Sequence, residues 1–169
     1  KSLLRHKLSA SPVAELTQGE FRLVIGEIDK IEKAAVTRLL FCSGKVYFDL
    51  LEARRENKIS NIAIARIEQL FPFPSAEVKA IIDSYPNLEE VVWVQEEPKN
   101  QGSWYYMQSR GTMIGCLSDK HTFGYAGRFY AASPATGSLK LHTAQQKQLI
   151  MDALQLDKLE VTTHKRALR

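Results

Sequence analysis

The turn Ser43-Gly44-Lys45 carries the residue types best suited to holding an anion. Small residues before a helix leave backbone N–H groups free, and these groups favour phosphates and carboxylates. Lys45 would lie in the first helical turn, where the helix dipole disfavours a cation by about 0.3–1 kcal/mol. We therefore expect a bound phosphate or an internal carboxylate beside its ammonium group. The candidate carboxylates are Glu68, Glu96 and Glu97. The spacing of a Walker A loop is missing.

Three arginines could add positive charge to such a site. Arg54 lies near the end of the same predicted helix, where the dipole suits a cation without any ligand. Arg66 ends a predicted buried strand, so a charged partner must lie near it. Arg128 stands in an aromatic stretch and could meet a phosphate or a carboxylate. Bidentate pairing with a carboxylate is the commoner outcome for such an arginine.

Glu96 and Glu97 are adjacent at the end of another predicted strand. Adjacent strand residues point to opposite faces, so the two carboxylates do not form a general acid/base pair. We expect one to anchor backbone amides or an arginine, and the other to contact solvent or a partner subunit. Pro98 and Gly102 predict a turn that is rigid at one end and closely packed at the other. His142 begins a predicted helix, which favours a capping or interface role.

The sequence contains no complete catalytic set. The four histidines have no second His or Cys at metal-ligand spacing, and Cys42 and Cys116 form no CxxC pair. Two lone cysteines are typical of a reducing compartment. The Gly-Asp-Gly and Asn-Asn pattern that holds magnesium and a diphosphate in thiamine enzymes is missing, as are a serine nucleophile elbow and a GxGxxG motif. The residues therefore indicate a candidate anion site without catalytic residues and without a metal.

The elements that position these residues alternate between strand and helix. Near-continuous apolar runs predict strands buried on both faces of a parallel sheet, over residues 36–42, 61–66 and 91–94. Residues 21–25 and 123–130 are further extended segments. Helices are expected over residues 45–56, after Ser75, over 102–114 and over 142–154, with Ser43 capping the first and Ser75 the second. This alternation predicts an α/β fold with a mainly parallel sheet flanked by helices.

The length and net charge of the chain limit its possible domain organisation and partners. The 169 residues suit one compact domain, and 23 basic against 19 acidic residues give a mild net charge of +4. We expect an arm or linker over residues 1–20, the domain over 21–156 and a basic tail over 157–169. The basic ends are expected to be solvated tails, so neither nucleic acid nor a membrane is a predicted partner. A first residue that is not methionine suggests a processed or shortened chain.

Several sequence blocks resemble the C-terminal, transketolase-like domain of the dehydrogenase component of 2-oxoglutarate dehydrogenase complexes. The most distinctive runs from Gln95 to Trp104 and contains Glu96, Glu97, Pro98, Asn100 and Gly102. The other blocks, in order, are residues 1–6, 39–50, 63–74 and 125–128, followed by 132–137 and His142. Together they cover about residues 1–155. The pair Phe129-Tyr130 departs from the family pattern, which has a proline or small residues there.

The resemblance implies a homodimeric enzyme of the tricarboxylic acid cycle. Such an enzyme decarboxylates 2-oxoglutarate with thiamine diphosphate and Mg²⁺, both bound outside this chain, and succinylates the lipoyl group of dihydrolipoyl succinyltransferase. The isolated domain would be inactive. Its location would be the cytoplasm of a bacterium or the mitochondrial matrix of a eukaryote. A 2-oxoadipate dehydrogenase, a 2-oxoglutarate decarboxylase and a binding-only dimerisation module remain as alternatives.

In some members of that family this domain contributes to a regulatory site for AMP or acetyl-coenzyme A. Carried over to matching positions, the resemblance implies a nucleotide or anion site formed by Ser43, Gly44, Lys45, Arg54, Arg66 and Arg128. It implies a structural or interface role for Glu96, Glu97, Pro98, Asn100, Gly102, Trp104 and His142.

Overall fold

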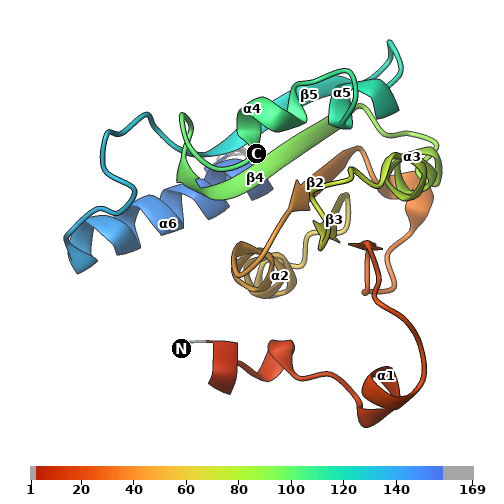
Figure 1. Cartoon of the computed structure of the whole chain (residues 1–169), viewed down its shortest axis with the longest axis horizontal. Coiled ribbons are helices and arrows are strands. Elements are labelled where there is room, and N and C mark those ends of the chain that lie inside the picture. The colour runs from red at the N-terminus through yellow and green to blue at the C-terminus, as the bar shows by residue number, and fades with distance from the viewer. Residues whose placement is uncertain (1–2, 158–169) are drawn as a thin grey trace, which may run out of the picture.

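The computed structural model describes residues 3–157, which form one sheet with helices on both faces (Figure 1). The strands are β1 (Val24–Ile25), β2 (Arg38–Cys42), β3 (Ile62–Ile67), β4 (Glu90–Pro98) and β5 (Thr122–Arg128). The α-helices are α1 (Val13–Thr17), α2 (Val46–Glu56), α3 (Ser75–Asp83), α4 (Trp104–Met107), α5 (Met113–Cys116) and α6 (Leu139–Leu154). Short 3-10 turns span Leu3–Arg5, Lys7–Ser9 and Lys33–Ala35.

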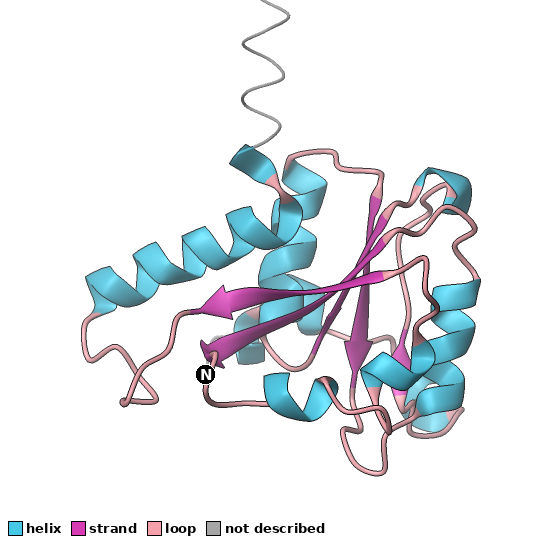
Figure 2. Ribbon diagram, turned by 90° about the horizontal axis from the view of Figure 1, so that it is seen from above, coloured by secondary structure: helices cyan, strands magenta, loops and turns pink. Residues whose placement is uncertain are grey.

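The sheet has the strand order β1-β3-β2-β4-β5. Strands β3, β2, β4 and β5 run parallel, and β1 pairs with β3 in the antiparallel sense. Figure 2 shows the strong twist of this sheet between its two helical layers. The predicted α/β class with a mainly parallel sheet is confirmed.

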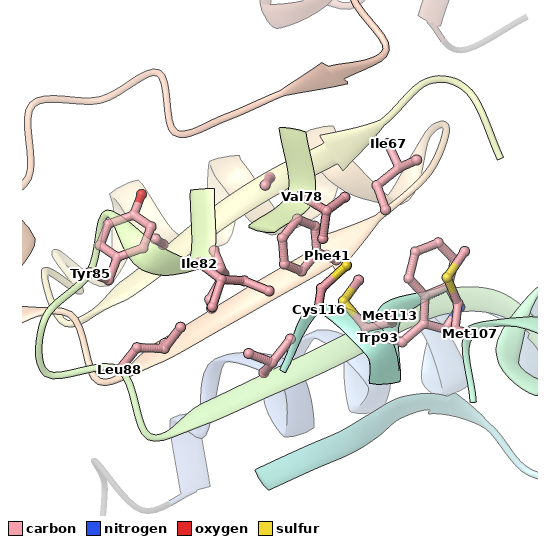
Figure 3. Close-up of a cluster of buried hydrophobic side chains, with 14 of the residues drawn as sticks. Phe41, Ile67, Val78, Ile82, Tyr85, Leu88, Trp93, Met107, Met113 and Cys116 are labelled. Carbon is pink, nitrogen blue, oxygen red and sulfur yellow. The ribbon is translucent and has the colours of Figure 1, made fainter. Parts of the chain in front are cut away.

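The three central strands, β2, β3 and β4, bury both of their faces, which explains their nearly continuous apolar sequences. One face, with Phe41 and Trp93, packs against α3, α4 and α5 (Figure 3). The other, with Leu40 and Val92, packs against α2 and α6. All five residues of β2 are buried. A full burial of such side chains contributes roughly 1.5–3 kcal/mol each, so the sheet is a rigid frame for the residues at its edges.

The helix predicted over residues 102–114 is wrong as a single element. It is broken into α4 and α5 by a turn between them. The Thr112 hydroxyl donates to the Tyr106 and Ser109 carbonyls, and the Gly111 N–H donates to the Ser109 hydroxyl. Side chains of Ser and Thr compete in this way for backbone groups that a continuous helix would use.

Four predicted boundaries also need correction. Ser43 doesn't cap α2: the Gly44 turn, at φ +73°, separates it from the helix, and Lys45 takes the position before Val46. Ser75 is the first residue of α3 rather than its cap. The last helix begins at Leu139, one turn before the predicted start. Strand β4 continues through residues 95–98 because their backbone still pairs with β5 across a bulge.

The first residues described, the predicted arm, pack on the face of the sheet that holds α2. Leu3 and Leu8 contact the cluster there, and the His6 ring lies 5.6 Å from that of Phe48. By contrast, α1 has no buried residue. The tail from residue 158 lies outside the described residues, and the domain boundaries remain a prediction. No described helix is long and apolar enough to cross a membrane.

His121, at the amino end of β5, makes stability depend on pH. Its Nδ1 accepts from the Ser118 N–H at 3.2 Å, and its Nε2 is buried with no partner among the described residues. Burial, followed by the charge of Lys120, holds the pKa of His121 below the ordinary 6.5. A depressed histidine pKa contributes stability above the unfolded value that is lost as pH falls through the folded value.

We therefore expect the thermal midpoint of the chain to fall as pH drops from about 7.5 to 5, a range in which histidine titrates. His121→Asn should reduce this fall, because the Asn oxygen can accept from Ser118 but does not titrate. Thermal denaturation followed by circular dichroism at each pH measures both slopes. Equal slopes for the two proteins would contradict the assignment to His121.

Candidate functional site

The carboxyl ends of the parallel strands form the edge where ligands of open α/β sheets bind. Strand β3 lies on one side of β2 in the sheet, and the next strand of the chain, β4, lies on the other side of β2. The helix after β2, α2, packs on one face of the sheet, and the helices after β4 pack on the opposite face. The topological switch point therefore lies between Cys42 and Val94, which pair at the ends of these strands. Residues 43–45 and 96–97 follow directly.

The Lys45 ammonium forms two ion pairs at this switch point. Its Nζ lies 2.6 Å from Asp49 Oδ2 and 3.2 Å from Glu96 Oε1. Burial disfavours the charged form, but the bonds to both carboxylates outweigh it and raise the pKa of Lys45. Of the two predicted alternatives, the internal carboxylate is therefore present. Asp49 was not predicted, although an acidic residue four positions along a helix is a usual partner of lysine.

A chain of hydrogen bonds connects Lys45 to Arg128. The Gln146 Nε2 donates to Asp49 Oδ2 at 2.9 Å, and the Gln146 Oε1 accepts from the Arg128 guanidinium at 3.1 Å. The same guanidinium nitrogen lies 2.9 Å from His142 Nδ1. Helix α6 thus joins strand β5 to helix α2 through side chains on its inner face. Nothing in the sequence pattern pointed to Gln146, because a glutamine on a helix usually faces solvent.

Arg128 does not pair with a carboxylate among the described residues, so that prediction is wrong. Its partners are the His142 ring and the Gln146 side-chain amide, because helix α6 lies against the end of β5. The Arg128 Nε is buried and has no partner within residues 3–157. A guanidinium without a carboxylate partner keeps its positive charge uncompensated. Arg128 is therefore the cation of this edge that retains capacity for an anion.

Arg66 has the charged partner that its position required. Its Nε contacts Glu68 Oε1, and its guanidinium lies over the rings of Tyr47 and Phe48, with centroids at 4.6 and 5.2 Å. Such stacking contributes about 0.5–1 kcal/mol at exposed sites and more when desolvated. This pairing fixes Arg66 at the carboxyl end of β3, one strand away from the Lys45 network.

Arg54 isn't brought to this edge. It lies at the opposite end of α2, with 1% of its surface exposed, and contacts Glu27, Asp29 and the Ile62 carbonyl at the start of β3. Nine residues of helix separate it from Lys45, or about 13 Å. The predicted anion site therefore reduces to two cations near the switch point, Lys45 and Arg128, with Arg66 beside them.

Gln95 holds the backbone of the distinctive motif in place. Its Oε1 accepts from Trp93 Nε1 and from the N–H groups of Ser103 and Trp104 at 2.9–3.1 Å. Its Nε2 donates to three carbonyls, those of Glu97, Pro98 and Gln101. The expectation that one glutamate anchors backbone amides or an arginine is wrong, because the neutral amide of Gln95 can serve donors and acceptors together and Glu96 pairs with a lysine. Glu96 instead faces Lys45, and Glu97 is exposed.

The other motif residues build the turn that follows. Asn100 exchanges two hydrogen bonds with the backbone of Ala131 and so holds the loop after β5. Gly102 has φ +64°, and a Cβ there would lie 3.0 Å from the Gln95 amide. Pro98 and Trp104 are buried, and the Trp104 ring packs against Tyr125 at 4.9 Å.

A groove of about 520 Å³ opens beside Arg128. It is lined by Glu96, Glu97, Arg128, His142 and residues 134–139, which lead into α6. The Ser138 side chain makes no capping hydrogen bond to α6, so the first N–H groups of that helix are available to a ligand. One wall therefore attracts anions and the other carries two carboxylates that can accept hydrogen bonds. Within residues 3–157 no group of three metal-binding side chains converges.

These features define an open α/β domain with a polar switch point and a groove beside it. The family model described as 2-oxoglutarate dehydrogenase C-terminal matches residues 10–154, and the chain belongs to that family. A 2-oxoglutarate dehydrogenase E1 component from Haemophilus influenzae is 51% identical over 154 residues, covering 91% of this chain and 16% of that protein. One from Coxiella burnetii is 47% identical over 158 residues, covering 92% and 17%. The chain spans about one sixth of the length of these relatives.

Proposed function

We propose that this chain is the C-terminal domain of a 2-oxoglutarate dehydrogenase. The intact homodimer would decarboxylate 2-oxoglutarate with thiamine diphosphate and Mg²⁺ bound on other domains, and transfer the succinyl group to the lipoyl group of dihydrolipoyl succinyltransferase. The relatives that carry this name come from bacteria, and we infer the bacterial cytoplasm as the location. The match of the family model to residues 10–154 carries the proposal.

The geometry supports a positioning role for this domain rather than a catalytic one. The titratable groups at the carboxyl edge are mostly bonded to one another, as Lys45 is to Asp49 and Glu96. A general base or nucleophile needs a free group within reach of the substrate. A side-chain network of this kind instead keeps neighbouring loops in a single conformation, which suits an edge that contacts another domain or subunit.

A domain exchange tests the proposal. The segment of the Haemophilus influenzae protein that aligns with this chain is replaced by the chain itself. We expect the chimera to retain 2-oxoglutarate-dependent turnover within about tenfold of the parent, since a loss of 1.4 kcal/mol in transition-state binding is tenfold in rate. The chain alone should show no turnover when thiamine diphosphate and Mg²⁺ are added. A folded chimera without activity, or turnover by the isolated chain, would contradict the proposal.

We also propose that the groove beside Arg128 binds a nucleotide such as AMP or acetyl-coenzyme A. The observation that favours it is the Arg128 guanidinium, which has no carboxylate partner and whose Nε has no hydrogen-bond partner among residues 3–157. A phosphate could meet Arg128 and the N–H groups at the start of α6. Ribose hydroxyls could then donate to Glu96 and Glu97 on the other wall. Lys45 would contribute less, because its charge is already compensated.

Calorimetry of AMP and of acetyl-coenzyme A on the full chain tests this second proposal. We expect binding that Arg128→Gln weakens by at least about tenfold, as loss of a charge-assisted hydrogen bond to phosphate does. Lys45→Ala should weaken it less, and Arg55→Gln, at the far end of α2, should leave it unchanged. Binding that is insensitive to Arg128→Gln but abolished by Lys45→Ala would move the site to the switch point. No heat with either nucleotide would reject the proposal for this chain.

A further inference from the structure

Two exposed tyrosines lie against each other beyond the carboxyl ends of β4 and β5. The hydroxyl groups of Tyr105, in α4, and Tyr130, which follows β5, are 3.0 Å apart, and the two residues are 55% and 61% exposed. The remaining tyrosines are buried or half-buried: Tyr47, Tyr85, Tyr106 and Tyr125. A hydroxyl pair in solvent gains little over hydrogen bonds to water, so this contact adds little to the stability of the fold.

Backbone contacts hold both tyrosines in place independently of that hydroxyl contact. The residue after the second tyrosine, Ala131, exchanges two hydrogen bonds with the Asn100 side chain. The residue before the first tyrosine, Trp104, donates its N–H to the side chain of Gln95, which is buried. The two rings therefore meet because the backbone positions them, although they are 25 residues apart in sequence.

The exposed rings have room to turn. A pocket of about 220 Å³ adjoins Tyr130 and is lined on its other side by Pro134 and Leu141. Exposed side chains change rotamer within picoseconds to nanoseconds. The ortho carbons of a tyrosine flank the carbon that bears its hydroxyl, and the two hydroxyls are already in contact. Small rotations therefore bring an ortho carbon of Tyr105 against one of Tyr130.

We propose that Tyr105 and Tyr130 are a site of oxidative cross-linking, at which a one-electron oxidant such as a peroxidase with hydrogen peroxide forms dityrosine. Each phenol loses one electron and its hydroxyl proton, and the two phenoxyl radicals join through a new bond between ortho carbons. The hydrogens of these carbons then move to the oxygens as protons, so both hydroxyls return. In total, one molecule of hydrogen peroxide accepts two electrons and two protons and becomes two molecules of water.

The new bond would join α4 to the loop that connects β5 with α6. This loop, residues 129–138, lines both the pocket beside Tyr130 and the groove beside Arg128. A covalent link between residues distant in sequence restricts the open states of the chain far more than the closed one. The link should therefore hold the loop in one conformation. It does not depend on nucleotide binding or on the activity of the intact enzyme.

Oxidation of the full chain by a peroxidase with limiting hydrogen peroxide tests the proposal. We expect dityrosine fluorescence and a monomer lighter by two hydrogen atoms, with one cross-linked peptide that contains both tyrosines. Groups on one framework react at an effective concentration of about a millimolar or more, so at about 10 μM chain this link should exceed links between chains by about a hundredfold. Cross-linked dimers without the internal link, or oxygen added to Trp104 in its place, would overturn the proposal.

Single variants separate this pair from general oxidation. Tyr105→Phe and Tyr130→Phe should each abolish the fluorescence of the monomer, since phenylalanine forms no phenoxyl radical. Tyr106→Phe is the matched control, because its hydroxyl donates to the Leu70 carbonyl, and it should leave the yield unchanged. Asn100→Ala frees the backbone after Tyr130 and should lower the yield about threefold or more, as loss of alignment slows a reaction between held groups. Equal yields in all four variants would assign the fluorescence to other tyrosines and overturn the proposal.

Limited proteolysis with elastase, which cleaves after small residues such as Ala131 and Ala132, measures the effect on the loop. Oxidation should slow cleavage of the unsubstituted chain about threefold or more, because cleavage requires local opening. Oxidation of Tyr105→Phe should leave the rate unchanged. A linked chain that is cut as fast as the unlinked one would show that the bond does not hold the loop.

Discussion

Replacing Gln95 with leucine is expected to lower the free energy of unfolding by roughly 3–5 kcal/mol, because several buried groups lose their partner together. Gln95 is 3% exposed; its Oε1 accepts three hydrogen bonds, and the two N–H groups of its Nε2 are shared among three carbonyls. Each buried group left unsatisfied costs about 1–3 kcal/mol. Leucine has a similar volume, so the loss measures hydrogen bonding rather than a cavity.

Urea denaturation of the chain with and without the substitution measures this loss. Gln148→Leu, on the exposed side of α6, removes one solvent-exposed hydrogen bond and serves as the matched control, with a change of at most about 0.5 kcal/mol. Gly102→Ala should also destabilise, since its Cβ would meet the Gln95 amide at 3.0 Å and its φ is +64°. The two effects should not add, because they act on one contact. A loss below about 1 kcal/mol for Gln95→Leu would show that water replaces the amide.

The strands of this fold could be predicted because the physics that forms them is local. The runs 39–42 and 91–94 are apolar at every position, as strands of a sheet covered on both faces require. The order of the strands could not be predicted in the same way. It depends on which helix covers which face, and therefore on contacts such as those of α6 with β4 and β5.

The candidate site was predictable only in part, for a related reason. The turn at residues 43–45 is a local motif, and its position at a strand end follows from the alternation of elements. The partner of Lys45, Asp49, was within reach of sequence reasoning at a spacing of four residues. Gln146 was not, since it comes from 97 residues away in sequence. Polar networks that join distant elements leave no periodic pattern in the sequence. Sequence analysis therefore identifies the charged residues but not their hydrogen-bond partners.

Gln95 shows the same difficulty inside a motif that was recognised. The sequence drew attention to Glu96 and Glu97, because charged residues are the usual carriers of chemistry. The structure gives the anchoring role to the neutral residue before them. An amide has donors and an acceptor, so unlike a carboxylate it can serve N–H and C=O groups at the same point. A buried carboxylate would meet the three carbonyls with repulsion.

The ion pair at the other end of α2 leads to the prediction with the second large effect. Arg54→Met should lower the free energy of unfolding by roughly 3–5 kcal/mol, because it leaves a buried carboxylate without its counter-charge. The Glu27 side chain is 7% exposed and bonds both to Arg54 and to the Ile64 N–H of β3. That N–H has no ladder partner in the short strand β1, so Glu27 cannot leave for solvent without exposing it.

A double-mutant cycle with Glu27→Gln separates the two parts of this loss. The glutamine oxygen can still accept from Ile64, and its neutral amide does not need the guanidinium. Arg54→Met with Glu27→Gln should therefore be more stable than Arg54→Met alone, by roughly 1–3 kcal/mol. Arg55→Met, which removes a half-exposed partner of Asp29, is the matched control with a loss of at most about 1 kcal/mol.

The same variants decide whether Arg54 belongs to the anion site. The chain should still bind nucleotide when Arg54→Met is combined with Glu27→Gln, since Arg54 and the groove beside Arg128 lie at opposite edges of the sheet. Calorimetry is done well below the thermal midpoint of each variant, so that both proteins are folded and only their nucleotide affinities are compared. If the double variant is folded but binds nucleotide tenfold more weakly, the carboxyl edge is not the whole site. If it binds unchanged, the role of Arg54 is to seal the amino edge of β3, and the positive charge that recognises a ligand is that of Arg128.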